Sequence, residues 1–142
     1  DFLLRYRRQK EEEAMYELAR RIRETNDIRS DLEGIKTRSG ELAADVLERA
    51  AAPIPAPVFK MYKNYIGHLR RKKESTLVSL AQAEAGVEEQ RRRLIQAGVD
   101  RKIIDRFKEI QHEAYREAEA RREQNNLDEL AALGASRRAN ED

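Results

Sequence analysis

Several residue types are absent or scarce, and each shortage excludes a class of protein. The chain has 142 residues and no cysteine, so it forms no disulfide and no Cys-ligated metal site. It has no tryptophan and only 6% aromatic residues, which is too little to fill the interior of a layered domain. No run of about 18 apolar residues occurs, and no apolar leader opens the chain, so we expect neither a transmembrane helix nor a signal peptide. Because the chain opens on Asp1 rather than Met, we expect its first residues to be missing.

Charge is abundant instead. Charged residues make up 39% of the chain and apolar residues another 39%, and 29 basic against 27 acidic side chains leave a net charge of +2. So polar a chain is either disordered or builds helices that bury only a narrow stripe. The two signs are interleaved, which is typical of a solvated helix surface and not of a strongly basic nucleic-acid-binding domain.

The three prolines stand together at positions 53, 55 and 57. Each removes a backbone donor and disfavours helix at the preceding residue, so this stretch predicts the main break in the chain. Gly134 is the expected C-cap of the second helix. The sequence therefore predicts one coiled-coil domain over 1–142, with a first helix over about 3–50, a turn over 51–57, a second helix over about 58–133 and a frayed tail over 134–142.

Apolar residues recur in steps of three and four on both sides of the prolines, which is typical of helices packed in a seam. The stripe before the turn comprises Met15, Leu18, Ile22, Thr25, Ile28, Leu32, Ile35, Ser39, Leu42 and Val46. The stripe after it comprises Phe59, Tyr62, Ile66, Leu69, Lys73, Thr76, Leu80, Ala83, Val87, Gln90, Leu94, Ala97, Arg101, Ile104, Lys108, Gln111, Tyr115 and Ala118. A second stripe, comprising Leu77, Ile95, Ile103, Phe107 and Ile110, predicts that the core shifts face late in the chain.

Two stripes flanking a short turn predict an all-α fold, a long antiparallel two-helix coiled coil. The second helix is predicted to be the longer one, so its end should extend beyond the first. An amphipathic helix without a neighbour leaves an apolar stripe exposed for a partner.

No constellation of catalytic residues is present, and we predict that the protein is not an enzyme and holds no cofactor or metal. His68 and His112 are far apart in the sequence, and both are expected on the helix surface. The run 11–13 consists of three glutamates, but consecutive helical residues point in different directions and do not share a metal ion.

One block of the chain is purely basic. Between 58 and 73 there are six basic side chains and no acidic one, interleaved with three aromatic residues. Three interpretations remain open: a nucleic-acid-binding hairpin tip, a surface that complements the acid-rich first helix, or a site for an acidic protein. The six basic residues are Lys60, Lys63, Arg70, Arg71, Lys72 and Lys73.

Three segments resemble the flagellar export proteins of the FliJ family. They are Leu3–Ala14 (LLRYRRQKEEEA), Met61–Leu69 (MYKNYIGHL) and Arg122–Ala131 (REQNNLDELA), in the order and spacing of the family. The proline-rich turn departs from the polar turns of other members.

This resemblance implies a cytoplasmic protein at the cytoplasmic face of the flagellar base, which inserts into the export ATPase hexamer and activates it. Its other implied partners are the FlhA-type export gate and export chaperones, without nucleic acid and with membrane association only through partners. Carried over by motif, the residues expected to contact the ATPase ring are Leu3, Leu4, Tyr6, Leu127, Asp128, Glu129 and Leu130. Those expected to contact the gate are Ile35, Leu42, Tyr65, Leu69, Lys72 and Thr76.

Two alternatives belong to other classes. The first is a nucleic-acid-binding helical hairpin built on the basic block, whose affinity would fall steeply with salt. The second is a generic structural coiled coil, or the equivalent stalk of a virulence-type secretion system, which the fold alone does not distinguish from a flagellar protein.

Overall fold

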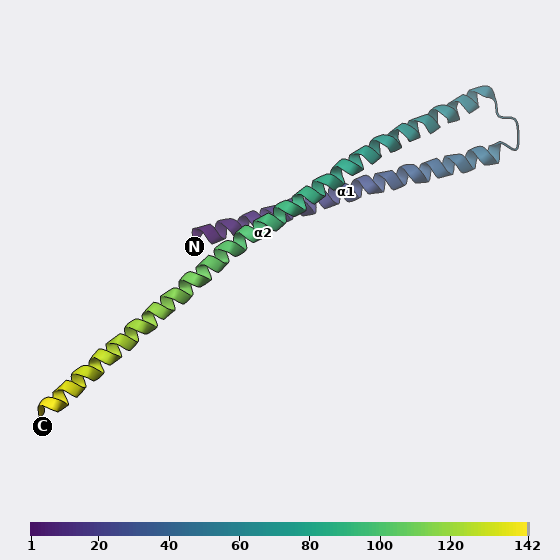
Figure 1. The fold of residues 1–142 in the computed structure, drawn as a ribbon. Coiled ribbons are helices and arrows are strands. Elements are labelled where there is room, and N and C mark those ends of the chain that lie inside the picture. Colours follow the sequence, from purple (N-terminus) through teal and green to yellow (C-terminus); the bar gives the residue numbers. More distant parts are fainter. Residues whose placement is uncertain (142) are drawn as a thin grey trace. The chain divides into compact units, whose positions relative to one another are not determined.

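The computed structural model describes residues 1–141, and it contains two helices and no strand over that range. Helix α1 spans Phe2–Arg49 and helix α2 spans Ala56–Glu141 (Figure 1). The predicted all-α helical hairpin is confirmed. The observed ends of α1 and the start of α2 differ from the predicted ones by one or two residues.

The turn between the helices is short, and its backbone hydrogen bonds end one helix and begin the next. Ala50 and Ala52 donate backbone hydrogen bonds to Val46 and Arg49, which close the end of α1. The Pro55 carbonyl oxygen accepts from the N–H groups of residues 58 and 59, each at 3.0 Å, and so begins α2. Pro57 then lies in the first helical turn, where N–H groups lack intrahelical acceptors in any case.

The two helices divide into two compact units. One, here called the hairpin unit, is Gln9–Ala97 and contains the turn. The other, here called the terminal unit, joins Asp1–Arg8 to the part of α2 from Gly98 onward. Each unit therefore contains a stretch of α1 and a stretch of α2.

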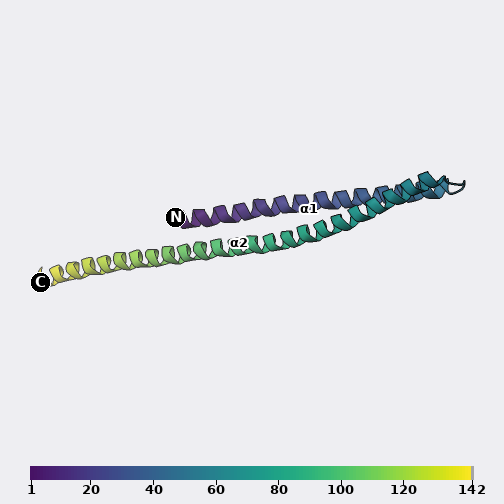
Figure 2. The ribbon, with the colours of Figure 1, turned by 90° about the horizontal axis from the view of Figure 1, so that it is seen from above.

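In the hairpin unit the two helices run antiparallel (Figure 2), and their buried side chains form one seam. Its buried apolar side chains are Leu32, Ile35, Leu69 and Val87, and no described side chain is less than 2% exposed. Tyr62 donates a hydrogen bond to the Asp45 carboxylate at 2.8 Å near the turn. Most of the predicted seam positions are buried or half-buried here, which confirms the heptad register.

Polar side chains also occupy the seam. Thr25 and Gln90 are buried, and both are satisfied: the Thr25 hydroxyl donates to the Arg21 carbonyl at 2.8 Å, and the Gln90 amide donates to the Ala14 carbonyl at 3.2 Å. Arg21 donates to the Gly86 carbonyl at 3.3 Å. A Cβ at Gly86 would stand 3.0 Å from that guanidinium, so the absence of a side chain at position 86 leaves room for Arg21.

Three details of the predicted seam are wrong. Met15 is exposed, because the seam passes through Ala14 instead. Phe59 is exposed because Val58 takes its place in the first turn of α2, and Ile66 and Lys73 also face solvent. In the terminal unit, the stripe positions from 108 to 118 are exposed, since only residues 1–8 of α1 belong to that unit.

The predicted end of the second helix also differs from the structure. Helix α2 continues through Gly134 to Glu141, and no described residue has a positive φ, so Gly134 is not a C-cap. A single glycine disfavours a helix by only about 1 kcal/mol, and its neighbours are ordinary helix formers. The last residue of the predicted frayed tail, 142, lies outside the described residues.

Candidate partner-binding surfaces

The first surface lies in the terminal unit, where ion pairs hold the start of α1 against α2. Arg7 approaches Asp100 at 3.3 Å, Arg8 approaches Asp105 at 3.7 Å, and the Lys108 amine lies 2.7 Å from the Asp1 carboxylate. Each of these pairs is partly exposed, so each contributes at most about 1 kcal/mol. All three pairs favour the packing of residues 1–8 against α2.

Among the predicted N-terminal ring contacts, the three residues differ in exposure. Leu4 is buried against α2, where it helps line a surface hollow together with Asp105 and Lys108. Leu3 and Tyr6 are exposed, and the Arg7 guanidinium lies 5.9 Å from the centre of the Tyr6 ring. Leu4 therefore packs inside the unit, and the other two side chains are accessible.

The predicted C-terminal contacts lie on the exposed end of α2. Residues 127–130 are all exposed, and Leu127 and Leu130 share one helix face because they are three residues apart. The Gln124 amide donates to the Asp128 carboxylate at 3.0 Å. The hollow beside Leu4 reaches to position 116 of α2, so Leu127 lies eleven residues further, about 16 Å along the helix. The structure does not bring the N-terminal and C-terminal residues together.

The second surface is a groove between the helices of the hairpin unit. Four of the six predicted gate contacts line it, namely Ile35, Leu69, Lys72 and Thr76. Ile35 and Leu69 are buried and form its floor, whereas Lys72 is exposed. The Thr76 hydroxyl donates to the Lys72 carbonyl at 2.7 Å. The structure therefore gathers these four residues, from two helices, at one place.

The other two predicted gate contacts lie outside this groove. Leu42 is half-buried in the seam. Tyr65 is exposed, and its ring stacks on His68 with 6.5 Å between ring centres and 18° between ring planes. Tyr65 is thus available to a partner, while Leu42 packs mainly within the hairpin.

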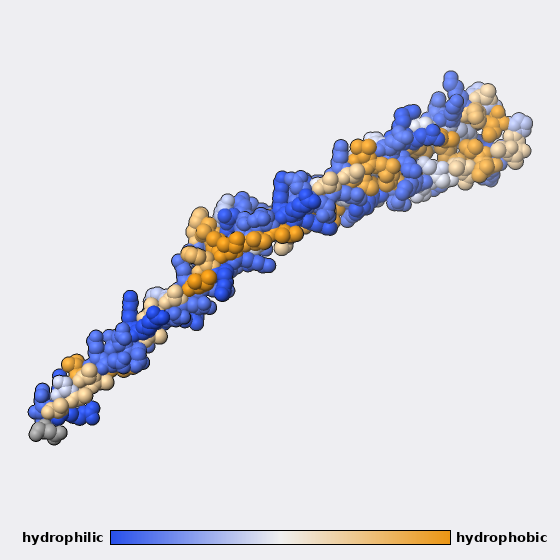
Figure 3. All heavy atoms as spheres, viewed as in Figure 1, coloured by the Kyte–Doolittle hydropathy of each residue, from blue (hydrophilic) through white to orange (hydrophobic). Residues whose placement is uncertain are grey.

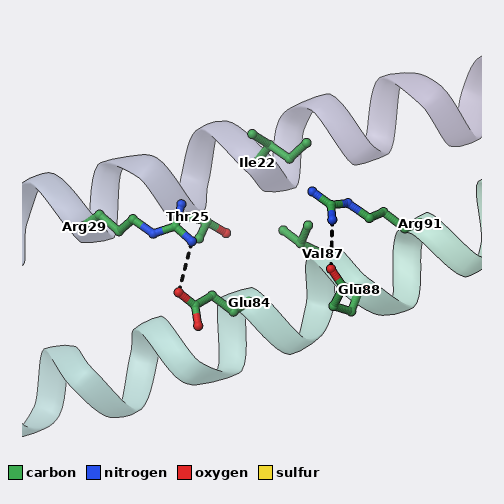
Figure 4. Close-up of a pocket in the computed structure, with 7 residues that line it drawn as sticks. All are labelled: Ile22, Thr25, Arg29, Glu84, Val87, Glu88 and Arg91. Carbon is green, nitrogen blue, oxygen red and sulfur yellow. Dashed lines mark hydrogen bonds and ion pairs between the residues drawn. The ribbon is translucent and has the colours of Figure 1, made fainter.

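Another groove was not predicted from the sequence (Figure 4). Arg29 of α1 bridges the seam to Glu84 of α2 at 3.0 Å, beside Thr25 and Val87. Arg91 pairs along α2 with Glu88, also at 3.0 Å. The periodicity of each helix alone does not determine which residues of α1 face which residues of α2, so this pairing was not predictable from the sequence.

The ionisable groups serve ion pairing and hydrogen bonding. Hydrogen bonds from Arg20 and Arg21 lower the pKa of Glu17 to about 2. The hydrogen bond to Asp45 raises the pKa of Tyr62. His68 and His112 are exposed. Within residues 1–141, no three His, Cys, Asp or Glu side chains are placed to share a metal ion.

Neither helix has a stretch long and apolar enough to cross a bilayer, as far as the chain is described. The family model of the flagellar FliJ protein matches residues 1–140. The chain belongs to the FliJ family. The predicted resemblance is therefore confirmed over nearly the whole chain, and FliJ membership supports a role in flagellar export. No curated protein and no solved structure matches the chain.

Two exposed apolar patches of this FliJ-family chain complete its surface. In the hairpin unit, Met15 and Tyr16 line a shallow hollow on α1. In the terminal unit, Ile103, Phe107 and Ile110 lie on one face of α2 and are all exposed. The sequence predicted that the core would shift onto these last three residues, which is wrong, because all three are exposed among the described residues of the terminal unit.

Proposed function

We propose that the chain is a non-enzymatic component of flagellar type III export. It acts as one coiled-coil domain that binds and activates the export ATPase ring and connects the ring to an FlhA-type gate and to export chaperones. It works at the cytoplasmic face of the flagellar base without cofactor or nucleic acid. The observation that carries this proposal is the FliJ-family match over residues 1–140, which favours a flagellar protein over the stalk of a virulence-type system.

Exposed leucines support the proposed contact with the ATPase ring. Leu127 and Leu130 project from a stretch of α2 in which every residue from 117 to 133 is exposed. Apolar side chains on one helix face are typical anchors for a groove in a partner. We assign the ring contact to Leu3, Tyr6 and residues 127–130, and we give Leu4 the separate role of holding the start of α1 in place.

The groove at Ile35 and Leu69 supports the proposed gate contact. Its floor contains Ile35 and Leu69, and its rim carries Lys72, Arg38 and Asp31, an arrangement that suits a protein segment with an apolar anchor and charged flanks. Tyr65 lies on the exposed surface of the same unit and extends the proposed contact. Leu42 supports it from within the seam.

The export ATPase assay tests the first part of the proposal. At micromolar concentration the unchanged protein should raise both ATP turnover and the fraction of hexamer of its cognate ATPase. A double variant, Leu127→Ser with Leu130→Ser, should lose most of this stimulation, since hot-spot residues contribute about 2 kcal/mol or more each. Leu47→Ser is the matched control, because Leu47 is exposed and outside the proposed contact.

Three outcomes decide the matter. Stimulation by the unchanged chain and by Leu47→Ser, but not by the double variant, supports the assignment. If the double variant still stimulates the ATPase, the assignment of the ring contact to Leu127 and Leu130 is wrong. No stimulation by the unchanged chain refutes the proposed role.

A further inference from the structure

The six basic residues between 58 and 73 are not neutralised by α1. None of them forms an ion pair with any residue in 1–141. Elsewhere in the chain, arginines pair repeatedly with carboxylates three or four residues away, as Arg20 does with Glu24. The interpretation that the block complements an acidic first helix is therefore not supported by the contacts.

Basic side chains outnumber acidic ones in this part of the chain. Residues 34–73, here called the hairpin end, contain nine basic and three acidic side chains, a net charge of +6. Three acidic residues border this segment, at positions 31, 33 and 74, and one of them, Glu33, pairs with Lys36 at 3.4 Å. The whole chain carries only +2, so the remaining residues together carry −4. Of the three carboxylates within residues 34–73, Asp45 is already engaged by Tyr62 and Arg49. The hairpin end is thus a concentrated positive site on a nearly neutral protein.

The charges face outward together. Lys60, Lys63 and Arg71 share the helix face opposite Tyr62 and Leu69, because they follow at steps of three and eight residues. The Arg71 guanidinium lies over Gly67, where a Cβ would stand 3.4 Å from it. All three basic side chains are exposed.

Large exposed apolar side chains lie close to the turn on both helices. Leu47 is 76% exposed, Phe59 57% and Met61 64%, and all three lie within a few residues of the turn. Figure 3 shows apolar and hydrophilic atoms side by side at this end of the hairpin unit. Basic residues combined with protruding apolar side chains are the composition of protein segments that rest in the interface of an anionic membrane.

We infer that the hairpin end binds directly to the surface of an anionic phospholipid bilayer. The basic face attracts the headgroups, and Phe59 and Met61 enter the interface. Leu47 and Met61, two of the three large apolar side chains beside the turn, have no ring to stack on a base. Phe59 and Tyr65 are exposed aromatic rings, so single-stranded RNA is the competing ligand that the experiment below has to exclude. This inference stands on charge and exposure and does not depend on the proposed export role. It adds a direct contact to the membrane association that the sequence predicted to be only indirect.

Vesicle binding by the full chain tests the inference. The protein should sediment with vesicles of phosphatidylcholine containing about one third phosphatidylglycerol, and not with pure phosphatidylcholine, and about 0.5 M salt should release it. The triple variant Lys60→Gln, Lys63→Gln and Arg71→Gln should bind roughly a hundredfold more weakly, at about fivefold per charge removed.

A matched control separates a local site from general charge attraction. Arg92→Gln, Arg122→Gln and Arg137→Gln remove the same total charge from exposed positions that form no ion pair with residues 1–141. This variant should bind as the unchanged protein does. Equal loss in both triple variants, or equal binding to both kinds of vesicle, would refute the inference. Binding to a single-stranded polyuridine probe more tightly than to anionic vesicles would refute it in favour of RNA.

The absence of tryptophan allows a second readout. In a Phe59→Trp variant, the only tryptophan should shift its emission to shorter wavelength on anionic vesicles and be quenched by brominated lipid. A Tyr16→Trp variant places the reporter at another exposed position and should show no change. Quenching at neither position, despite sedimentation, would show that the hairpin end is not the part that touches the bilayer.

Discussion

Replacing Leu69 with alanine should destabilise the protein strongly. Leu69 is 4% exposed and forms the floor of the seam together with Ile35. Truncating a buried leucine to alanine costs 2–5 kcal/mol, and we expect about 3 kcal/mol here because a seam between only two helices allows some relaxation. Such a loss is a large share of the total stability of an ordinary domain, which is about 5–15 kcal/mol.

The same substitution at Leu127 provides the control. Leu127 is 61% exposed and lies in the same helix, so the change in intrinsic helix propensity is nearly equal at the two positions and only the packing differs. We expect Leu127→Ala to change the free energy of unfolding by less than about 0.5 kcal/mol.

Urea unfolding followed by circular dichroism measures both variants. With a urea m-value of about 1.5 kcal/mol per molar, Leu69→Ala should lower the midpoint by about 2 M and leave the slope unchanged. A loss below about 1 kcal/mol for Leu69→Ala, or an equal loss for Leu127→Ala, would refute the packing of α1 against α2 in the hairpin unit.

Two smaller effects follow from single side chains. Because Arg20 and Arg21 lower the pKa of Glu17 from 4.5 to about 2, its stabilising contribution is full above about pH 4.5 and disappears as the pH falls to about 2. Carbon NMR should show the carboxylate titrating near 2, and a midpoint near 4.5 would contradict this. Gly40→Ala should raise the melting temperature, with a gain of about 1 kcal/mol, since nothing lies within 4 Å of the added Cβ; an unchanged or lower melting temperature would mean that this part of α1 is not helical.

The heptad pattern predicted the seam of the hairpin unit where apolar residues dominate it. Leu80, Val87 and Leu94 face α1 as expected, because a repeat of three and four leaves one face to bury. The pattern failed at Met15, where the seam instead passes through Ala14. At that position α1 and α2 lie close together, and the Gln90 amide donates a hydrogen bond to the Ala14 carbonyl. A search for apolar residues does not find a seam contact that consists of an alanine and a glutamine.

The candidate surfaces were only partly predictable for a related reason. Ile35 and Leu69 occupy the same heptad stripe as the core, and the structure buries both while placing them at the floor of a groove. Periodicity assigns a residue to a face of its helix, but it does not say which part of that face the partner helix covers. The resemblance to the FliJ family identified three segments and their order along the chain. The exposure of each residue in them could be seen only once the two helices were packed together.

The hydrogen bonds across the hairpin unit join residues at very different separations along the chain. Tyr62 and Asp45 are 17 residues apart, whereas Gln90 and Ala14 are 76 apart. Closing the shorter loop loses less conformational entropy. Once the contacts next to the turn have formed, the next pair of residues closes only a short additional loop. Folding is therefore favoured to start beside the prolines and to progress away from them, so that during synthesis α1 pairs only after the ribosome has released the beginning of α2.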